Sequence, residues 1–198
     1  SGLRALLTLD GKFATPRVEY LVNANRLVMN DMGLDNLRAS GEATVDAERI
    51  TIPIEASVSR ITGLDTVAGG SLRNVRLAGD LAIDGPRILS DNMRIRSDRI
   101  DAGLVLLADT STGLYTGAID GRIDDYRIES VGIFNIETDV DLQSEGSGFA
   151  LAGRVRARST SLFNEGVRDF LGGNLVAGSD VRYGSDGIVR FSNLSLRA

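Results

Sequence analysis

The stretch LDNLRASGEATVDAERI at residues 34–50 returns as LRNVRLAGDLAIDGPRI at residues 72–88, and this internal repeat decides the fold class. The two copies keep identical residues at one fixed offset of about 38 positions. The shared positions include Asn36 and Asn74, Arg38 and Arg76, Gly41 and Gly79, Asp46 and Asp84, and Arg49 and Arg87. A period of this length is typical of repeat architectures whose units stack on one another. We therefore expect the unit to pack against a copy of itself.

Apolar and polar residues alternate through the repeat and beyond it. In residues 50–58, ITIPIEASV, every second side chain is apolar and most of the others are polar. A period of two is that of a half-buried β-strand, because successive side chains of a strand point to opposite faces. The same alternation recurs in residues 77–83, 93–96, 134–142 and 149–157, and Asp-Gly or Gly-Gly turn signals separate the runs. The pattern predicts an all-β protein with long strands.

One segment follows a helical spacing instead. Its apolar residues are Phe163, Val167, Phe170 and Leu171. Ser161 is a candidate N-cap, and the glycine pair at residues 172–173 is a natural stop. These signals predict one short amphipathic helix over residues 161–171. Residues 17–28 are compatible with helix or strand, and the strands predicted on both sides favour a strand.

Composition limits the class of protein. With 198 residues, 42% of them hydrophobic, 25% charged and a mean hydropathy of zero, the chain is expected to form one folded body over residues 1–198 without a membrane-spanning segment. The net charge of −5, with no basic stretch that carries interleaved aromatics, argues against a nucleic-acid partner. Cysteine is absent, which excludes disulfides but fits either redox compartment.

The chain contains few of the residue types that commonly act in catalysis. The chain contains no histidine, so serine and cysteine triads and histidine metal ligands are excluded. Its one lysine, Lys12, follows an Asp-Gly turn, a poor place for an activated base. We therefore expect no enzyme activity, no cofactor and no metal site.

Carboxylate chemistry is the remaining catalytic alternative. Asp120, Asp124 and Asp125 lie in one stretch, and β-solenoid glycosidases and lyases work with aspartate and arginine alone. Asp139 and Asp141 share a strand face, which raises the question of calcium, although the spacing matches no calcium loop. Turn formation and a solvated polar face are the favoured interpretations.

An arginine stripe formed by Arg154, Arg156 and Arg158 has two interpretations as well. Guanidinium groups bind lipid phosphates in bidentate fashion. More often such a stripe keeps the outer face of a sheet soluble, and we favour this second interpretation.

The main candidate for a functional surface is the face of the strands on which every second, apolar side chain lies. Alternation alone favours an ordinary core inside a sandwich or solenoid. However, aromatic residues make up only 5% of the chain and tryptophan is absent, so this face resembles hydrocarbon more than a recognition pocket with convergent polar groups. The candidate lipid-facing residues are Ile50, Ile52, Ile54, Val58, Leu77, Leu81, Ile83, Met93, Ile95, Ile119, Ile123, Ile128, Phe134, Ile136, Val140, Leu142, Phe149, Leu151 and Val155.

The repeat, the aliphatic strands and four segments together resemble the TamB family, the translocation and assembly module proteins of Gram-negative envelopes, which belong with AsmA-like and bridge-like lipid-transfer proteins. The four segments are GSLRNVRLAGDLAIDGPRIL (70–89), GLYTGAIDGRIDDYRIESVGI (113–133), FALAGRVRAR (149–158) and FNEGVRDFLGGN (163–174). The family motifs are glycine and aliphatic patterns without a catalytic signature.

The resemblance implies an elongated sheet curled into an open trough, a β-taco, with an apolar concave face. It implies a periplasmic location, an inner-membrane anchor in the full-length protein, phospholipid as cargo and an outer-membrane partner of the TamA or BamA type. Because the alternating pattern runs into the last residues, we expect the chain to be a segment of a longer periplasm-spanning protein.

Three functional hypotheses follow from these features. A lipid conduit requires the apolar face to stay open. A structural scaffold for outer-membrane protein assembly requires that face to be sealed into a closed core. A carbohydrate-active solenoid requires a polar cleft with paired carboxylates.

Overall fold

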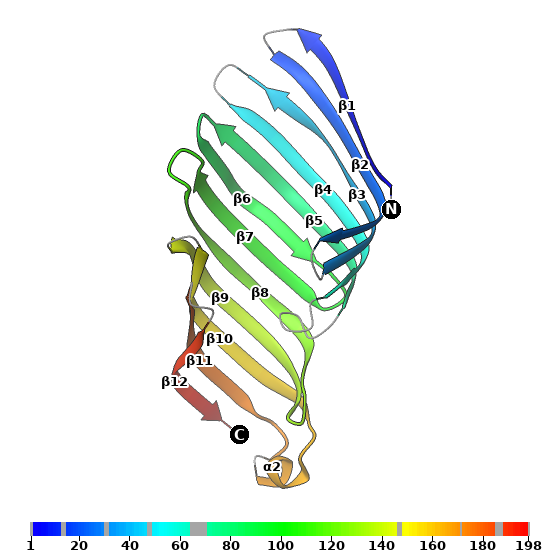
Figure 1. Cartoon of the computed structure of the whole chain (residues 1–198). Helices are drawn as coiled ribbons and strands as arrows, with labels where there is room; N and C mark the ends of the chain where they lie inside the picture. The colour runs from blue at the N-terminus through cyan, green and yellow to red at the C-terminus, as the bar shows by residue number, and fades with distance from the viewer. Residues whose placement is uncertain are drawn as a thin grey trace. The chain divides into compact units, whose positions relative to one another are not determined.

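The computed structural model describes residues 2–12, 15–29, 32–46, 49–63, 71–145, 148–170, 172–184 and 188–197. These residues form an all-β structure, a 12-stranded antiparallel sheet in which the order of the strands follows the chain (Figure 1). The strands are β1 (Leu3–Lys12), β2 (Thr15–Met29), β3 (Met32–Val45), β4 (Ile50–Thr62), β5 (Leu72–Asp84), β6 (Arg87–Arg96), β7 (Ile100–Asp109), β8 (Leu114–Ile128), β9 (Gly132–Glu145), β10 (Gly148–Leu162), β11 (Val176–Tyr183) and β12 (Val189–Arg197). The sheet is open, with β1 and β12 as its edges. The prediction of long strands in an all-β chain is confirmed.

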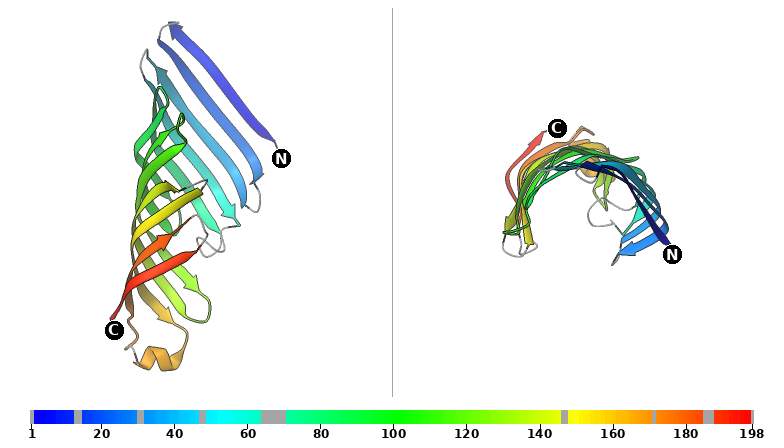
Figure 2. Two further views of the ribbon diagram at one scale, coloured as in Figure 1. Left: turned by 60° about the vertical axis from the view of Figure 1, so that its left-hand side comes forward. Right: turned by 90° about the horizontal axis from the view of Figure 1, so that it is seen from above.

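The chain divides into two compact units. The first comprises Ser1–Asp98 and Gly103–Leu114, and it contains β1 to β6 and most of β7. The second comprises Arg99–Ala102 and Tyr115–Ala198, and it contains β8 to β12 and the short helix α2 (Glu165–Phe170). In Figure 2 the strands β1 to β6 of the first unit lie side by side in chain order.

The repeat lies in neighbouring hairpins of the first unit. The first copy lies mainly in β3 and the second in β5, and both strands pair with β4, which separates them. The hairpin of β3 and β4 therefore lies beside the hairpin of β5 and β6, as a self-packing unit requires. Asn36 and Asn74, which are equivalent in the repeat, both adopt left-handed backbone with φ of 54° and 53°. Asparagine tolerates this conformation better than most residues, which explains its presence at both positions.

The left-handed asparagines interrupt the alternation along their strands. Leu72 and Val75 are three positions apart and both are buried, with Asn74 between them. The side chain of Asn36 donates a 2.9 Å hydrogen bond to the hydroxyl of Ser59, which in turn donates to the backbone oxygen of Asp35. A polar link thus joins β3 to β4 at this irregularity.

The second unit contains a similar irregularity, which is a register shift between β8 and β9. Ile123 lies opposite Ile136, but the next pairing is Tyr126 with Phe134, so β8 contains one residue more than β9 over this interval. Asp125 is the left-handed residue there, with φ of 53°, and its N–H donates to the side-chain oxygen of Asn135 at 3.1 Å. The extra residue is a β-bulge, which changes the parity that faces a given side.

The helix prediction is confirmed in type and corrected at its start. Ser161 belongs to β10 and is not an N-cap, because β10 continues to the end of its pairing with β9. Helix α2 begins at Glu165 and has six residues. The predicted stop is confirmed, since both glycines have positive φ and the N–H of Gly173 donates to the backbone oxygen of Arg168. Leu171, predicted to lie within the helix, is outside the described residues.

The packed core is small in both units. In the first unit Val58, Leu72 and Val75 are buried, and in the second Phe134 and Leu162 are buried. No large side chain of the described residues is completely buried. The described strands contact their chain neighbours, and helix α2 contacts β10. The core is therefore a local accumulation of side chains near the irregularities of a single-layered sheet.

Candidate functional site

The apolar side chains of the first unit lie on one face. Residues that pair directly across antiparallel strands project to the same side. The pairings on that side include Ile50 with Ile83, Ile52 with Leu81, Ile54 with Gly79, Val58 with Val75, and Leu77 with Ile95. Met93 joins this set, because it lies two residues before Ile95 on β6 and therefore on the same parity. All nine candidate residues of this unit therefore share a face, with Ile50, Ile52, Ile54, Val58, Leu77, Leu81, Ile83, Met93 and Ile95 as its members.

The second unit brings its candidates together in the same way. The pairings are Ile119 with Val140, Ile123 with Ile136, Ile128 with Gly132, Leu142 with Leu151, Thr138 with Val155, and Ser144 with Phe149. Phe134 follows two residues after Gly132 on the same parity. We call the apolar side of each unit its aliphatic face.

Simple alternation missed several members of these faces. At the left-handed residues, the alternate positions whose side chains face the aliphatic side change from one set to the other. Beyond these residues the aliphatic face therefore includes a paired row, formed by Leu34, Ile61 and Leu72. Strand β2 contributes Val18 and Val22, which pair with Ala43 and Ala39. The edge strands also contribute apolar residues, which are Leu3, Leu7, Leu9, Val189, Phe191, Leu194 and Leu196. The repeated asparagines were the available signal, because they mark where parity changes.

Few polar groups are available on the aliphatic faces. In the second unit Thr138 donates to the backbone oxygen of Gly121, and the hydroxyls of Ser144 and Ser159 accept backbone N–H groups. In the first unit the buried hydroxyl of Ser90 has no hydrogen-bond partner among the described residues. Because recognition pockets orient a ligand with convergent polar groups, these faces suit a ligand that is itself hydrocarbon.

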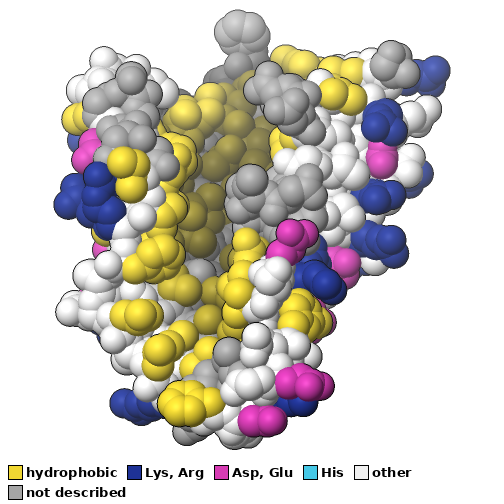
Figure 3. Space-filling model, turned by 60° about the horizontal axis from the view of Figure 1, so that its bottom comes forward, with side chains coloured by type: hydrophobic (Ala, Val, Ile, Leu, Met, Phe, Trp, Pro, Cys, Tyr) yellow, Lys and Arg dark blue, Asp and Glu magenta, His cyan; other side chains and the backbone are white. Residues whose placement is uncertain are grey.

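The aliphatic faces are open to a considerable degree. The most exposed members lie on the edge strands, with Leu7 and Leu9 of β1 at 67% and 70% and Phe191 and Leu194 of β12 at 67% and 66%. Most of the interior members are half-buried. Figure 3 shows hydrophobic side chains gathered along a hollowed surface, with most of the charged side chains outside it. In the described part of the chain, α2 is the one element that is not a strand, and it lies at the end of β10. Contiguous apolar surface of this kind marks an interaction site.

On the opposite face of the second unit the register places acidic residues beside two arginines. Arg154 lies between Asp139 and Asp180, and Arg156 lies opposite Glu137. Arg158 pairs with Asn135. Opposite charges across strands stabilise a sheet, so this register agrees with the favoured interpretation of the arginine stripe as part of a soluble outer face.

The carboxylates considered for catalysis lie on strand β8 and do not converge on a cleft. Asp120 lies opposite Asp139, and Asp124 forms a 3.5 Å ion pair with Arg122. Asp125 occupies the bulge. Within the described ranges no group of three or more acidic residues is arranged to hold a metal ion.

Tyr20 links β2 to β4 across Gly41. Its phenol donates a 2.5 Å hydrogen bond to the backbone oxygen of Pro53, and a side chain at Gly41 would collide with the tyrosine ring. Pro53 has no N–H to donate, and it lies in the interior strand β4, where the pairing between β3 and β4 is interrupted. Burial, followed by the negative charge of Glu55, raises the pKa of Tyr20.

This tyrosine predicts an alkaline loss of stability. The stabilising effect of the raised pKa is fully present below the unfolded value of about 10 and is lost as pH rises through the folded value. We expect Tyr20→Phe to lower the free energy of unfolding by about 1 kcal/mol at pH 7 and to flatten the decline above pH 10. Urea unfolding at pH 7 and in the alkaline range measures both effects. An unchanged alkaline slope in the variant would contradict this assignment.

Comparison of the chain with protein-family models, curated proteins and solved structures found no significant match. None of the helical segments described is long and apolar enough to cross a membrane. The argument for function therefore depends on the geometry of the aliphatic faces.

Proposed function

We propose that this chain is a non-catalytic lipid-binding segment whose aliphatic faces shield phospholipid acyl chains from water. The observation that supports this is a face of paired isoleucine, leucine and valine side chains that no described helix or second sheet covers. Burying a methylene group is worth about 0.8 kcal/mol, so a chain of about 16 carbons gains on the order of 12 kcal/mol. A face of this kind removes most of the cost of moving such a chain through water.

The same chemistry favours movement over tight binding. Hydroxyl groups on the face of the second unit bond the backbone and offer no fixed anchor for a ligand. Neighbouring positions therefore have similar affinity for an acyl chain, and the chain slides along the strands. Transport by this route requires no chemical step.

The resemblance to the TamB family supports a more detailed form of the proposal. In this form the sheet is a gently curled trough with its apolar side concave, and the full-length protein is anchored in the inner membrane and crosses the periplasm. Phospholipid passes along the trough toward the outer membrane, where a TamA or BamA type insertase is the partner.

An assembly scaffold is the second candidate. The strands β1 and β12 are open edges of the sheet, and an open edge can pair with a strand of another chain. Such pairing serves outer-membrane protein assembly without lipid transfer. A carbohydrate-active solenoid has less support, because Asp124 is in an ion pair with Arg122, and Asp120 lies opposite Asp139 on an ordinary strand surface.

Extraction of the purified chain tests the first candidate. We expect phospholipid to co-purify, and native mass spectrometry to show protein species that carry one or more phospholipid masses, which detergent then removes. Photoactivatable acyl chains should label residues of the aliphatic faces. A chain that carries no lipid and captures none from vesicles would falsify the conduit and favour the scaffold.

A further inference from the structure

A row of arginines crosses the polar face of the first unit. Arg4 pairs with Asn23, which pairs with Arg38; Arg38 pairs with Ser57, which pairs with Arg76; and Arg76 pairs with Arg96. Because paired residues share a face, these side chains form one continuous line over β1 to β6. We call Arg4, Arg38, Arg76 and Arg96 the arginine row. Two of its members, Arg38 and Arg76, are equivalent in the internal repeat.

Three of the four charges in this row have no ion-pair partner within the described structure. Arg4, Arg38 and Arg76 form no ion pair with any described residue, whereas Arg17 pairs with Glu42 at 3.6 Å elsewhere on β2. Arg38 and Arg76 both lie opposite Ser57, which carries no charge to compensate them. Guanidinium groups without an acidic partner are well suited to an anionic ligand that neutralises them.

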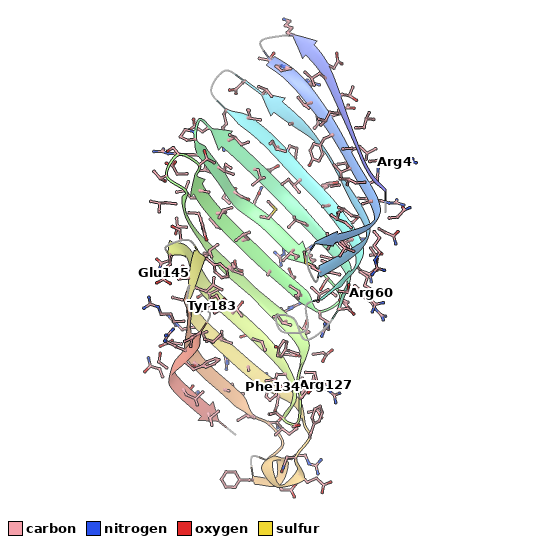
Figure 4. The ribbon with its side chains drawn as sticks, in the orientation of Figure 1. Arg4, Arg60, Arg127, Phe134, Glu145 and Tyr183 are labelled. Carbon is pink, nitrogen blue, oxygen red and sulfur yellow. The ribbon has the colours of Figure 1, made fainter. Side chains whose placement is uncertain are left out.

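Hollows lie between the arginines. Arg4, Asn23, Asn36 and Arg38 line the first, and Arg38, Glu55, Ser57 and Arg76 line the second. Alternate strands are about 9.6 Å apart, and the intervening Asn23 and Ser57 are short. Each hollow therefore has room for a phosphate-sized group between two guanidinium groups. Figure 4 shows Arg4 and Arg60 extending from the same margin of this unit.

We propose that the arginine row is a docking site for the phosphate groups of an anionic phospholipid surface. Guanidinium groups bind phosphate through paired, charge-assisted hydrogen bonds. The row contains no aromatic side chain on which a nucleobase could stack, and the chain as a whole is negatively charged. The opposite side of the same strands is the aliphatic face. The choice of a lipid occupant rests on the proposed function, and docking here brings the segment to the membrane that supplies its cargo.

Vesicle flotation of the whole chain tests this inference. The wild type is expected to bind vesicles that contain phosphatidylglycerol, to bind phosphatidylcholine vesicles much more weakly, and to dissociate as salt is raised. The Arg38→Gln/Arg76→Gln variant is expected to bind the anionic vesicles about 25-fold more weakly, since each arginine near such a surface contributes about fivefold. The matched control is Arg154→Gln/Arg156→Gln, which removes the same charge from the second unit and is expected to bind normally.

Stability distinguishes lost docking from lost folding. Arg38 and Arg76 form no ion pair with a described residue, so the melting temperature of the double variant is expected to be unchanged. Equal binding by this variant and the wild type, or equal wild-type binding to both kinds of vesicle, overturns the proposal. Arginine-dependent binding of a single-stranded oligonucleotide with the same affinity overturns the lipid occupant.

A fatty-acid uptake measurement distinguishes a failure of the arginine row from a failure of the proposed function. The Arg38→Gln/Arg76→Gln variant is expected to take up a fluorescent fatty acid as the wild type does, because the row and the aliphatic face lie on opposite sides of the strands. Failure of fatty-acid uptake in the wild type counts against the proposed function. Loss of that uptake in the variant alone overturns the separation of the two sites.

Discussion

Replacing Ile136 by aspartate is expected to weaken capture of a phospholipid acyl chain about 100-fold while the sheet stays folded. Ile136 lies between Ile123 and Ala157 on the aliphatic face of the second unit, and it is half-buried. In the free chain the carboxylate keeps contact with water. An acyl chain that covers the carboxylate removes this hydration, which costs several kcal/mol. A net cost of about 2.8 kcal/mol corresponds to the 100-fold loss of affinity. Titration with a fluorescent fatty acid measures the change.

The same strand offers a matched control. Ile133 lies on the opposite face, where it pairs with Arg127, so Ile133→Asp introduces the same charge on the polar side. This variant is expected to capture acyl chains normally. Circular dichroism and thermal unfolding establish whether each variant is folded. If Ile136→Asp unfolds the second unit, the face is a closed core and the scaffold becomes the better assignment.

Truncation of Phe134 to alanine is expected to reduce the free energy of unfolding by about 3 kcal/mol. Phe134 is only 4% exposed and lies between Tyr126 and Ser159, next to the register shifts of β8 and β10. Removing a buried phenyl ring sacrifices its transfer free energy and leaves a cavity, and such changes typically cost 3–5 kcal/mol. We expect a loss at the lower end of this range, because the phenyl ring packs against a single layer of sheet. Urea unfolding of the whole chain measures the loss.

Phe191 provides the comparison for this prediction. It lies on the edge strand β12 with 67% of its surface exposed, so Phe191→Ala is expected to change stability by less than about 0.5 kcal/mol. Similar small losses for both phenylalanines would show that the residues near the bulges do not form a packed core. Similar large losses would show that the edge strand is covered in solution.

The alternation of residues 50–58 was sufficient to predict β4 and its apolar parity, because the period of two is a local property of an extended chain. The same reasoning placed Ile136 and Val140 on one face. It failed beyond Asn74 and Asp125, where a left-handed residue changes the parity. It also misplaced the start of α2, because pairing with β9 extends β10 through Ser161. That extension depends on a partner strand, which local spacing does not contain.

The sequence by itself determined the strands, the repeat, the glycine stop of the helix and the absence of histidine and cysteine chemistry, since each of these depends on residue type and short-range spacing. Only the tertiary structure decided the register, and register decided which side chains meet. It placed Arg76 opposite the neutral Ser57, but Arg154 between two aspartates, although both arginines belong to similar alternating runs. Long-range pairing sets these neighbours, and the charge of a neighbour decides whether an arginine is satisfied within the sheet or remains available to a ligand.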